Sequence, residues 1–411
     1  MQIENHTKHL RSLVRLNLDM KVAFFSECYT PVTNGVVTSL RTLREALRSK
    51  GHTIYLFAPG APQPDDDEHI FRLKELPFPR HPYHFARPFT RPEVDFRSLG
   101  VELVHCHHPF TVGRMGAELA RKYDLPMVYT AHTLYDDMAE LSRSQLLRKV
   151  GPKAARGVVR RFCDKASFVI VPSRHTLEAL NEDGVLAKFS IIPSGVPPMD
   201  PRPGARERIR TELGIGNVPL LLQVSRLGPE KRVDLLLRAV AKLKERQLPA
   251  PASDFHLAIV GDGQCREDLE ELAKQLGIQD RVTFAGYQPF HAVGDWYNSA
   301  DIFVLSSPDE TQGLTLVEAM AAGLPCIAIN HGGPAELVRD GETGLLAEFS
   351  DSSLTEKICA LLCDPALREQ LGNASLQLSH LFTPEKMANS VLEVYQEVMS
   401  LRSQKMLDGK Y

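Results

Sequence analysis

The sequence predicts an α/β protein made of two doubly wound domains, each with helices on both faces of a parallel sheet. Its 411 residues exceed what one hydrophobic core usually organises. Short apolar runs alternate with longer segments of helical periodicity along most of the chain. One proline-rich segment, Ser194–Gly204, breaks this alternation and has the composition of a linker. We therefore predict domains over residues 1–197 and 198–383, followed by a helix over residues 384–403.

The predicted strands are near-continuous hydrophobic runs, as expected for strands buried on both faces of a sheet. Those of the first domain lie at Lys21–Ser26, Thr53–Ala58, Leu103–His107, Met127–Thr130 and Phe168–Val171. Those of the second domain lie at Leu220–Ser225, His256–Val260, Val282–Ala285, Ile302–Leu305 and Cys326–Ile329. Segments of helical period separate the strands, for example Val233–Gln247 and Arg266–Leu276.

The composition is that of a soluble globular protein and argues against several other classes. Hydrophobic residues make up 43% of the chain and charged residues 24%, without a run long enough to span a membrane. The first twenty residues lack the apolar core of a secretory signal, so we expect a cytoplasmic location. The 7 cysteines contain no C-x-x-C pair, which argues against a disulfide framework and a zinc cage. No nucleic-acid-binding pattern is present, so nucleic acid is not an expected partner.

The turns that follow the strands are the candidate sites, because ligands of open parallel sheets bind beyond the carboxyl ends of the strands. Gly35 follows the first strand and precedes a helix whose N-terminus could receive a phosphate, although a simple turn glycine is an equal interpretation. The same turn lacks the G-x-G-x-x-G triplet of a dehydrogenase, which weakens an oxidoreductase interpretation. The nearest substitute, Gly261-Asp262-Gly263, occurs in the second domain and is weak by itself.

Two cations follow the first strand of the second domain. Arg226 and Lys231 lie at a strand exit with a helix beginning behind them. Such a pair can neutralise the charge that develops on a diphosphate leaving group, without a metal. Isolated cations are usually solvated surface residues, so the position at the strand exit carries this interpretation.

Two glutamates with seven residues between them follow another strand of the second domain. Glu310 lies in the loop and Glu318 lies one turn into a predicted helix. Gly313 lies between them, where the helix should begin, which leaves the amides of Gly313, Leu314 and Thr315 pointing outward. One carboxylate can therefore sit near a sugar while the other reaches the hydroxyl pair of a ribose. By spacing alone, two solvated glutamates remain the simpler interpretation.

In combination these segments resemble the retaining glycosyltransferases of family 4, which carry an E-x7-E motif and have the GT-B fold. That fold consists of two facing Rossmann-like domains with a cleft between them. The matching elements cover the chain from Lys21 to about Ser403. They are Asn34-Gly35-Val36-Val37, Ala131-His132-Thr133, Val171-Pro172-Ser173, Ile192-Pro193-Ser194-Gly195-Val196, Arg226 with Lys231, Gly261-Asp262-Gly263, and Glu310 to Glu318 followed by Ala319-Met320-Ala321-Ala322-Gly323-Leu324-Pro325.

The resemblance implies a role for each matching residue. The donor would be a nucleotide-sugar bound by the second domain, and the first domain would bind the acceptor. Glu310 would contact the hydroxyls of the transferred sugar and Glu318 would hold the ribose. Diphosphate, phosphate and sugar contacts would come from Arg226, Lys231, Gly35, Gly263, Gly313, Leu314 and Thr315. No cofactor and no metal are implied, and the terminal helix would cross back to the first domain.

Histidines at strand ends have competing interpretations. His132 would lie at the reacting face according to the resemblance, whereas an isolated histidine usually packs or caps. His107 and His108 look like a metal pair, but adjacent strand residues point to opposite faces and no carboxylate–histidine cluster completes a site. We therefore predict no metal site.

Motif variants around His132 and Glu310 resemble the branch of glucosyltransferases that build glycosyl-diacylglycerols at membrane surfaces. The first half of the chain fits this acceptor, because residues 1–200 carry 27 lysines and arginines against 22 acids, and the rest carries 21 against 29. The aromatic and basic segment Phe71–Pro92 and the basic helix at Leu146–Lys165 could contact an anionic membrane, or be a stiff loop and a solvated helix face. The cations of that helix include Arg148, Lys149, Arg156 and Arg160.

We therefore expect a retaining transferase that moves a hexose, glucose from UDP-glucose in the first instance, to a hydroxyl of a lipid or a glycan. It would be cytoplasmic, or peripheral on the inner face of the membrane. A cytosolic enzyme of polysaccharide, mannoside or thiol-glycoside synthesis is the alternative within the class. A non-catalytic nucleotide-sugar-binding scaffold is the alternative from another class, and the presence of all the expected charged residues argues against it.

Overall fold

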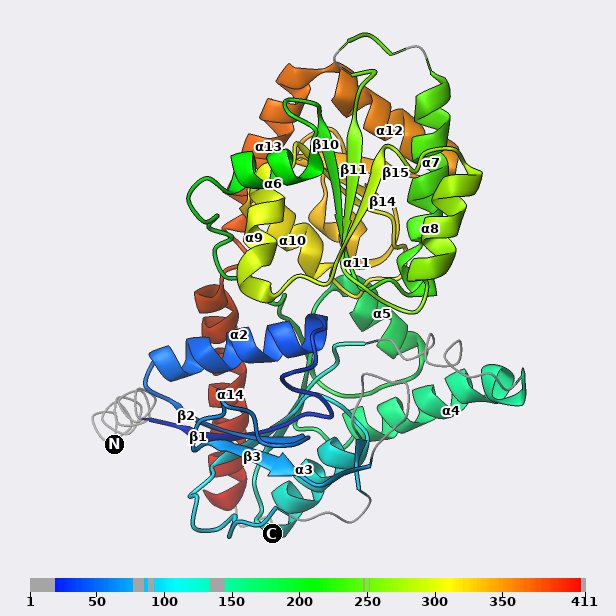
Figure 1. Ribbon diagram of the computed structural model, residues 1–411. Coiled ribbons are helices and arrows are strands. Elements are labelled where there is room, and N and C mark those ends of the chain that lie inside the picture. The colour runs from blue at the N-terminus through cyan, green and yellow to red at the C-terminus, as the bar shows by residue number, and fades with distance from the viewer. Residues whose placement is uncertain are drawn as a thin grey trace, which may run out of the picture. The chain divides into compact units, whose positions relative to one another are not determined.

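The computed structural model describes residues 19–76, 85–87, 92–133, 145–246, 248–250 and 252–407. The chain divides into two compact units, which are drawn in Figure 1. The N-terminal unit extends to Gly195 and also contains the final helix from Pro384. The C-terminal unit spans Val196–Thr383. Each unit is an α/β sandwich with its own parallel sheet.

The N-terminal unit is organised by a parallel sheet with strand order β3-β2-β1-β6-β7-β8-β9. The order reverses between β1 and β6, and this is the topological switch point at which such sheets bind ligands. A separate antiparallel pair joins β4 (Glu75–Leu76) and β5 (Phe85–Ala86). The sheet strands are β1 (Lys21–Phe25), β2 (Thr53–Pro59), β3 (Ile70–Leu73), β6 (Leu103–Cys106), β7 (Met127–Thr130), β8 (Phe168–Val171) and β9 (Phe189–Ile191).

Helices cover both faces of this sheet, because successive strand residues point to opposite sides. Val22 and Phe24 of β1 belong to one core, whereas Ala23 and Phe25 belong to the other. The final helix, α14, packs beside α2 in the first of these cores (Figure 1). The helices are α2 (Gly35–Ser49), α3 (Thr111–Lys122), α4 (Gln145–Cys163), α5 (Arg174–Glu182) and α14 (Pro384–Leu407).

The C-terminal unit repeats this plan with a parallel sheet of strand order β12-β11-β10-β13-β14-β15. Its order reverses between β10 and β13, which places its switch point there. The strands are β10 (Leu220–Val224), β11 (His256–Val260), β12 (Val282–Gly286), β13 (Ile302–Leu305), β14 (Cys326–Ile329) and β15 (Gly344–Ala347). The helices are α6 (Ala205–Leu213), α7 (Val233–Glu245), α8 (Arg266–Gln275), α9 (Phe290–Ser299), α10 (Leu314–Ala321), α11 (Gly332–Leu337), α12 (Asp351–Cys363) and α13 (Pro365–Ser379), with a 3-10 turn at Pro229–Lys231.

The proline-rich segment after Ser194 is packed onto the C-terminal unit rather than lying loose between the units. Val196 and Met199 are buried in that unit's core. The amide of Val196 donates to the carbonyl of Phe382, with an N···O distance of 2.8 Å. Along the chain, the boundary between the units therefore lies between Gly195 and Val196, two residues before the boundary that composition alone suggested. Apolar side chains within the segment explain the difference.

Candidate functional site

The carboxyl ends of the four central strands of the C-terminal sheet bring the predicted donor residues together. The strands β11, β10, β13 and β14 are consecutive neighbours, so the turns that follow them share one edge of the sheet. The turn after β10 carries Arg226 and Lys231, and the turn after β13 carries Glu310. These two turns flank the switch point between β10 and β13, where ligands of such sheets bind.

Lys231 and Glu310 form an ion pair across the switch point. Lys231 Nζ donates to Glu310 Oε1 at 2.7 Å, and both side chains remain about one-fifth exposed. Burial disfavours the ammonium, but the Glu310 carboxylate outweighs it, so the pKa of Lys231 lies above its ordinary value. Lys231 is therefore a permanent cation that a ligand can still reach.

Two serine hydroxyls hold the turn that carries Lys231 against the exit of β13. Ser306 Oγ donates to the carbonyl of Lys231 at 2.9 Å, and Ser307 Oγ donates to the carbonyl of Glu230 at 3.0 Å. Both serines are fully buried. Because the backbone of the turn is fixed in this way, the ion pair has a defined position before any ligand binds.

Arg226 has its own carboxylate partner. Arg226 Nη2 donates to Glu230 Oε1 at 2.5 Å, and about one-third of the arginine side chain is exposed. The two cations are thus matched by two carboxylates, Glu230 and Glu310, in the ligand-free protein. The sequence analysis did not predict that Glu230 pairs with Arg226. The signal was present, because residues four positions apart can form an ion pair within one helical turn.

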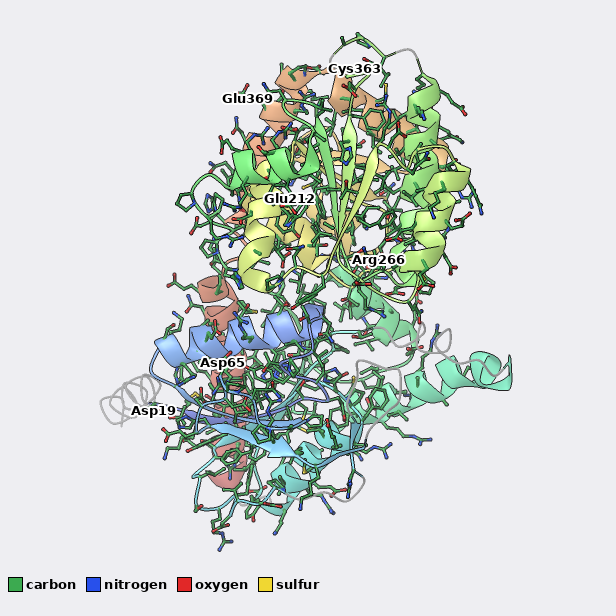
Figure 2. All side chains as sticks on the ribbon, in the orientation of Figure 1. Asp19, Asp65, Glu212, Arg266, Cys363 and Glu369 are labelled. Carbon is green, nitrogen blue, oxygen red and sulfur yellow. The ribbon has the colours of Figure 1, made fainter. Side chains whose placement is uncertain are left out.

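Gly263 is predicted to contact the donor, and the structure gives a packing reason for the glycine. A Cβ atom at Gly263 would lie 2.5 Å from the carbonyl oxygen of Leu227, so only glycine lets the two turns approach. Its amide donates to Asp262 Oδ1 at 2.7 Å. Arg266, labelled in Figure 2, begins α8 and pairs with Asp262 and Glu270. The loop is therefore internally hydrogen-bonded.

Gly313 is the N-cap of α10 and has the left-handed conformation that favours glycine, with a φ of 89°. No side chain caps this helix. The amides of Gly313, Leu314 and Thr315 lie in its first turn, at the positive end of the helix dipole, where an anionic or hydroxyl group can be bound. The helix, predicted to begin near Leu314, begins at Leu314.

Glu318 lies in the second turn of α10 and is buried. Its Oε2 accepts a hydrogen bond from the hydroxyl of Tyr297 of α9 at 2.7 Å. Burial raises the pKa of Glu318 to about 7, which the tyrosine hydrogen bond partly offsets. The carboxylate is thus oriented by a partner that sequence reasoning missed, because Tyr297 lies 21 residues away in a different helix.

His132 follows β7 in the N-terminal unit and contacts a second histidine. Its Nε2 lies 3.0 Å from Nδ1 of His107. Burial lowers the pKa of His132 to about 4, so its imidazole is neutral at physiological pH. His108 points elsewhere and its Nδ1 accepts from the amide of Glu27 at 3.2 Å. Within the described part of the chain, no group of three or more potential metal ligands is present.

Gly35 is exposed and is the first residue of α2. The preceding Asn34 caps the helix, because its Oδ1 accepts from the amide of Val37 at 2.8 Å. The helix has no acidic residue in its first turn. Its N-terminus therefore keeps a positive potential at the switch point of the N-terminal sheet.

The basic segments of the N-terminal unit are placed only in part. Arg156 pairs with Asp183 at 3.5 Å and Arg160 with Asp164 at 4.0 Å, and each arginine side chain is about half exposed. Arg148 and Lys149 lie within α4, but their side chains are outside the described residues. Most of Phe71–Pro92 also lies outside them.

One cation of the Phe71–Pro92 segment differs from the expectation of an interfacial loop. Arg72 is buried in β3, where its Nη2 pairs with Asp66 Oδ1 at 2.6 Å. It therefore stabilises the edge of the sheet and is unavailable to a membrane. The aromatic side chains between the cations of this segment had suggested that the segment contacts a membrane.

Comparisons with known structures and sequences agree on the class. The chain aligns with the solved structure of Anabaena HepE in complex with UDP and glucose at a TM-score of 0.72 and 19% identity, covering 92% of this chain and all of that one. Two such doubly wound units with these strand-end residues define a glycosyltransferase of the GT-B fold.

The chain belongs to glycosyltransferase family 4. The family model described as Glycosyltransferase Family 4 matches residues 33–199, and the model described as Glycosyl transferases group 1 matches residues 205–377. It is 30% identical to the alpha-monoglucosyldiacylglycerol synthase of Streptococcus pneumoniae over 85% of this chain and 80% of that protein. It is 29% identical to the Acholeplasma laidlawii protein of the same name, over 94% and 99% respectively.

Proposed function

We propose that this glycosyltransferase transfers glucose from UDP-glucose to a hydroxyl of a lipid such as diacylglycerol, with retention of the anomeric configuration. The observation that carries the donor half of this proposal is the Lys231–Glu310 pair, 2.7 Å long, at the switch point of the C-terminal sheet. The acceptor half rests on the two alpha-monoglucosyldiacylglycerol synthases that the chain resembles.

An exchange of partners by Lys231 and Arg226 accounts for donor binding. A diphosphate offers each cation a stronger anion than the carboxylate it holds in the ligand-free protein. When Lys231 turns to the phosphate, Glu310 becomes able to accept hydrogen bonds from the sugar hydroxyls. The amides at Gly313–Thr315 then bind the donor, and the oriented carboxylate of Glu318 accepts from the ribose hydroxyls. The two cations supply the charge that a metal provides in other transferases, so the reaction needs none.

Retention follows from the chemistry of donor and product. The glucosyl group of UDP-glucose is α-linked to phosphate, and both named relatives make an alpha product according to their names. An α-linked donor that gives an α-linked product keeps its configuration. We assign the reacting face to His132, whose neutral imidazole can exchange hydrogen bonds with the sugar but carries no charge, and phosphate contact to Gly35.

A lipid acceptor also agrees with the surface at the end of α4. Leu186 is 87% exposed, and its amide donates to Asp164 Oδ1 just beyond the end of that helix. The half-exposed cations Arg156 and Arg160 lie on α4. An exposed leucine beside cations is the combination that peripheral proteins insert into anionic membrane surfaces. No helix among the described residues is both long and apolar enough to cross a membrane.

The proposal is tested by incubating the protein with UDP-glucose and diacylglycerol in anionic vesicles and following the release of UDP. We expect an α-glucosyl lipid, identified from the coupling constant of its anomeric proton. A β-linked product would overturn retention. UDP release with a soluble glycan hydroxyl but not with diacylglycerol would overturn the lipid acceptor while leaving the donor site intact.

A further inference from the structure

The final helix of the chain reaches His132 through a chain of aromatic side chains within the N-terminal unit. Tyr395 of α14 is fully buried, and its hydroxyl lies 2.6 Å from Nδ1 of His105 in β6. On the other side of the same ring, His105 Nε2 lies 2.7 Å from Oγ1 of Thr130 in β7. Both nitrogens of His105 are therefore engaged, so its ring plane is fixed by two strands and a helix.

The fixed ring of His105 supports the ring of His107. The two residues point to the same face of the sheet because they are two positions apart. Their rings stack with centroids 4.3 Å apart and planes 30° apart. Phe24 contacts both rings edge-on, at 5.1 Å and 4.8 Å. In this packing His107 directs Nδ1 at His132 Nε2, 3.0 Å away, with the ring planes 22° apart.

The direction of the proton between these two histidines follows from the other nitrogen of His107. His107 Nε2 is buried and has no hydrogen-bond partner among the described residues. A buried N–H group without a partner is rarer and costlier than a buried acceptor without one. His107 therefore carries its proton on Nδ1 and donates it to Nε2 of His132, which leaves the proton of His132 on Nδ1.

His105, His107 and His132 are all neutral. Their effect on one another is therefore to fix ring orientation and tautomer, and not to supply charge. Burial lowers the pKa of His105 to about 3 and that of His132 to about 4, and it lowers the pKa of His107 well below its ordinary value. In a neutral imidazole, the hydrogen bond at one nitrogen decides whether the other nitrogen donates or accepts.

We propose that Tyr395, Thr130 and His105 are positioning residues for His132, acting through His107 to hold its ring in place and its proton on Nδ1. The final helix then does more than close the fold, because it contributes to the orientation of a residue of the reacting face. The inference rests on the proposed function for the role of His132 in turnover, but the tautomer of His132 is independent of that role.

Two pairs of variants test the positioning. Tyr395→Phe removes the hydroxyl and keeps the ring. The control, Tyr55→Phe, removes another tyrosine hydrogen bond of the same unit, to the carbonyl of Leu99, and this bond involves none of His105, His107 and His132. Thr130→Val removes the hydroxyl from β7, and Thr130→Ser restores one. We expect Tyr395→Phe and Thr130→Val to lower kcat about fivefold, the factor for one neutral hydrogen bond, without changing KM for UDP-glucose. Tyr55→Phe and Thr130→Ser should leave kcat unchanged.

Nitrogen-15 NMR of histidine-labelled protein reports the tautomer directly, with His132→Gln used to assign the resonance. We expect wild-type His132 to be the Nδ1–H tautomer. Tyr395→Phe should shift the nitrogen resonances of His132, because the ring of His107 that donates to it is no longer held through His105, and should lower the thermal midpoint slightly, because Nδ1 of His105 loses its buried partner. An Nε2–H tautomer in the wild type, or an unaltered His132 spectrum and kcat in Tyr395→Phe, would overturn the inference. If instead His132→Gln kept full turnover while the spectra behaved as expected, only the assignment of His132 to the reaction would fail.

Discussion

The two units share a fold but handle polar groups at their switch points in opposite ways. The C-terminal unit presents ion pairs, Arg226–Glu230 and Lys231–Glu310, that remain partly exposed. The N-terminal unit presents neutral histidines, such as His107 and His132, that are held by hydrogen bonds and ring stacking. Exposed cations suit a diphosphate, whose charge must be neutralised. Buried neutral rings suit the orientation of a hydroxyl and a sugar. Under the proposed function, this difference assigns the charged part of the reaction to the C-terminal unit and the neutral part to the N-terminal unit.

Removal of the Lys231 ammonium is expected to have the largest effect. Lys231→Met keeps most of the length of the side chain, but leaves the diphosphate charge uncompensated and Glu310 without its partner. We expect kcat/KM for UDP-glucose to fall about 10²–10³-fold, as when one preorganised donor is removed from a transition-state site. The control is Lys242→Met, which breaks a similar pair with Asp351 in the same unit. Equal losses in the two variants would show that the effect is general destabilisation.

The C-terminal unit should also differ from the N-terminal unit in how its stability depends on pH, because its buried carboxyl Glu318 has a raised pKa. Both folded and unfolded states hold the proton of Glu318 below pH 4.5, and only the folded state holds it up to about pH 7. The contribution of Glu318 to the free energy of unfolding is therefore largest at low pH and falls as the pH rises across this window, by on the order of 3 kcal/mol. In Glu318→Gln this decrease in stability with rising pH should be absent. Thermal midpoints at pH 5 and pH 8, compared between wild type and variant, measure it.

The matched control for that measurement is Glu369→Gln, at an exposed position on α13 that Figure 2 labels. It should keep the wild-type pH dependence. A wild-type midpoint that moved with pH exactly as Glu318→Gln does would contradict the raised pKa of Glu318.

The hydroxyl of Tyr297 tests whether the donor site also depends on buried orientation, as the N-terminal unit does. Tyr297→Phe removes the 2.7 Å hydrogen bond to Glu318 and keeps the ring. We expect the Kd for UDP to rise about tenfold to a hundredfold, the range for one hydrogen bond to a charged group, with kcat little changed. Calorimetric titration with UDP gives the Kd. An unchanged Kd would mean that Glu318 needs no orientation or does not touch the nucleotide.

The smallest effects are expected from the surface cations of the N-terminal unit. Arg156→Ala and Arg160→Ala should each weaken sedimentation with anionic vesicles by about fivefold at low salt, and added salt should reduce the difference. Lys274→Ala removes an exposed cation from the C-terminal unit and should have no effect on sedimentation. Equal effects of all three variants would remove the distinction between a membrane-facing and a donor-binding unit.

The sequence predicted the parts of the fold and site that depend on local pattern. Central strands such as β10 and β13 are buried on both faces, and their hydrophobic runs end within a residue of the predicted limits. The edge strands β3 and β9 were missed because they are only four and three residues long, are half exposed, and each include a polar residue. The start of α10 after Gly313 was predictable because a glycine precedes the segment of helical period.

The partners of the site residues were not predictable in the same way. Tyr395 and His105 are 290 residues apart, and only the return of α14 to the N-terminal unit brings them together. The pairing of Lys231 with Glu310 spans 79 residues and depends on the strand order at the switch point. Their positions after strands and the resemblance to family 4 identified Lys231, Glu310 and Glu318 as candidates, whereas the contacts that orient them follow from topology.

The most direct measurement of the central claim is a calorimetric titration of UDP into wild-type protein and Lys231→Met in the presence of a metal chelator. The account predicts that UDP binds the wild type without metal, that Lys231→Met weakens binding at least tenfold, and that Lys242→Met does not. Binding that requires a divalent metal, or equal affinity in wild type and Lys231→Met, would contradict the claim that the ion pairs of the C-terminal unit form the donor site.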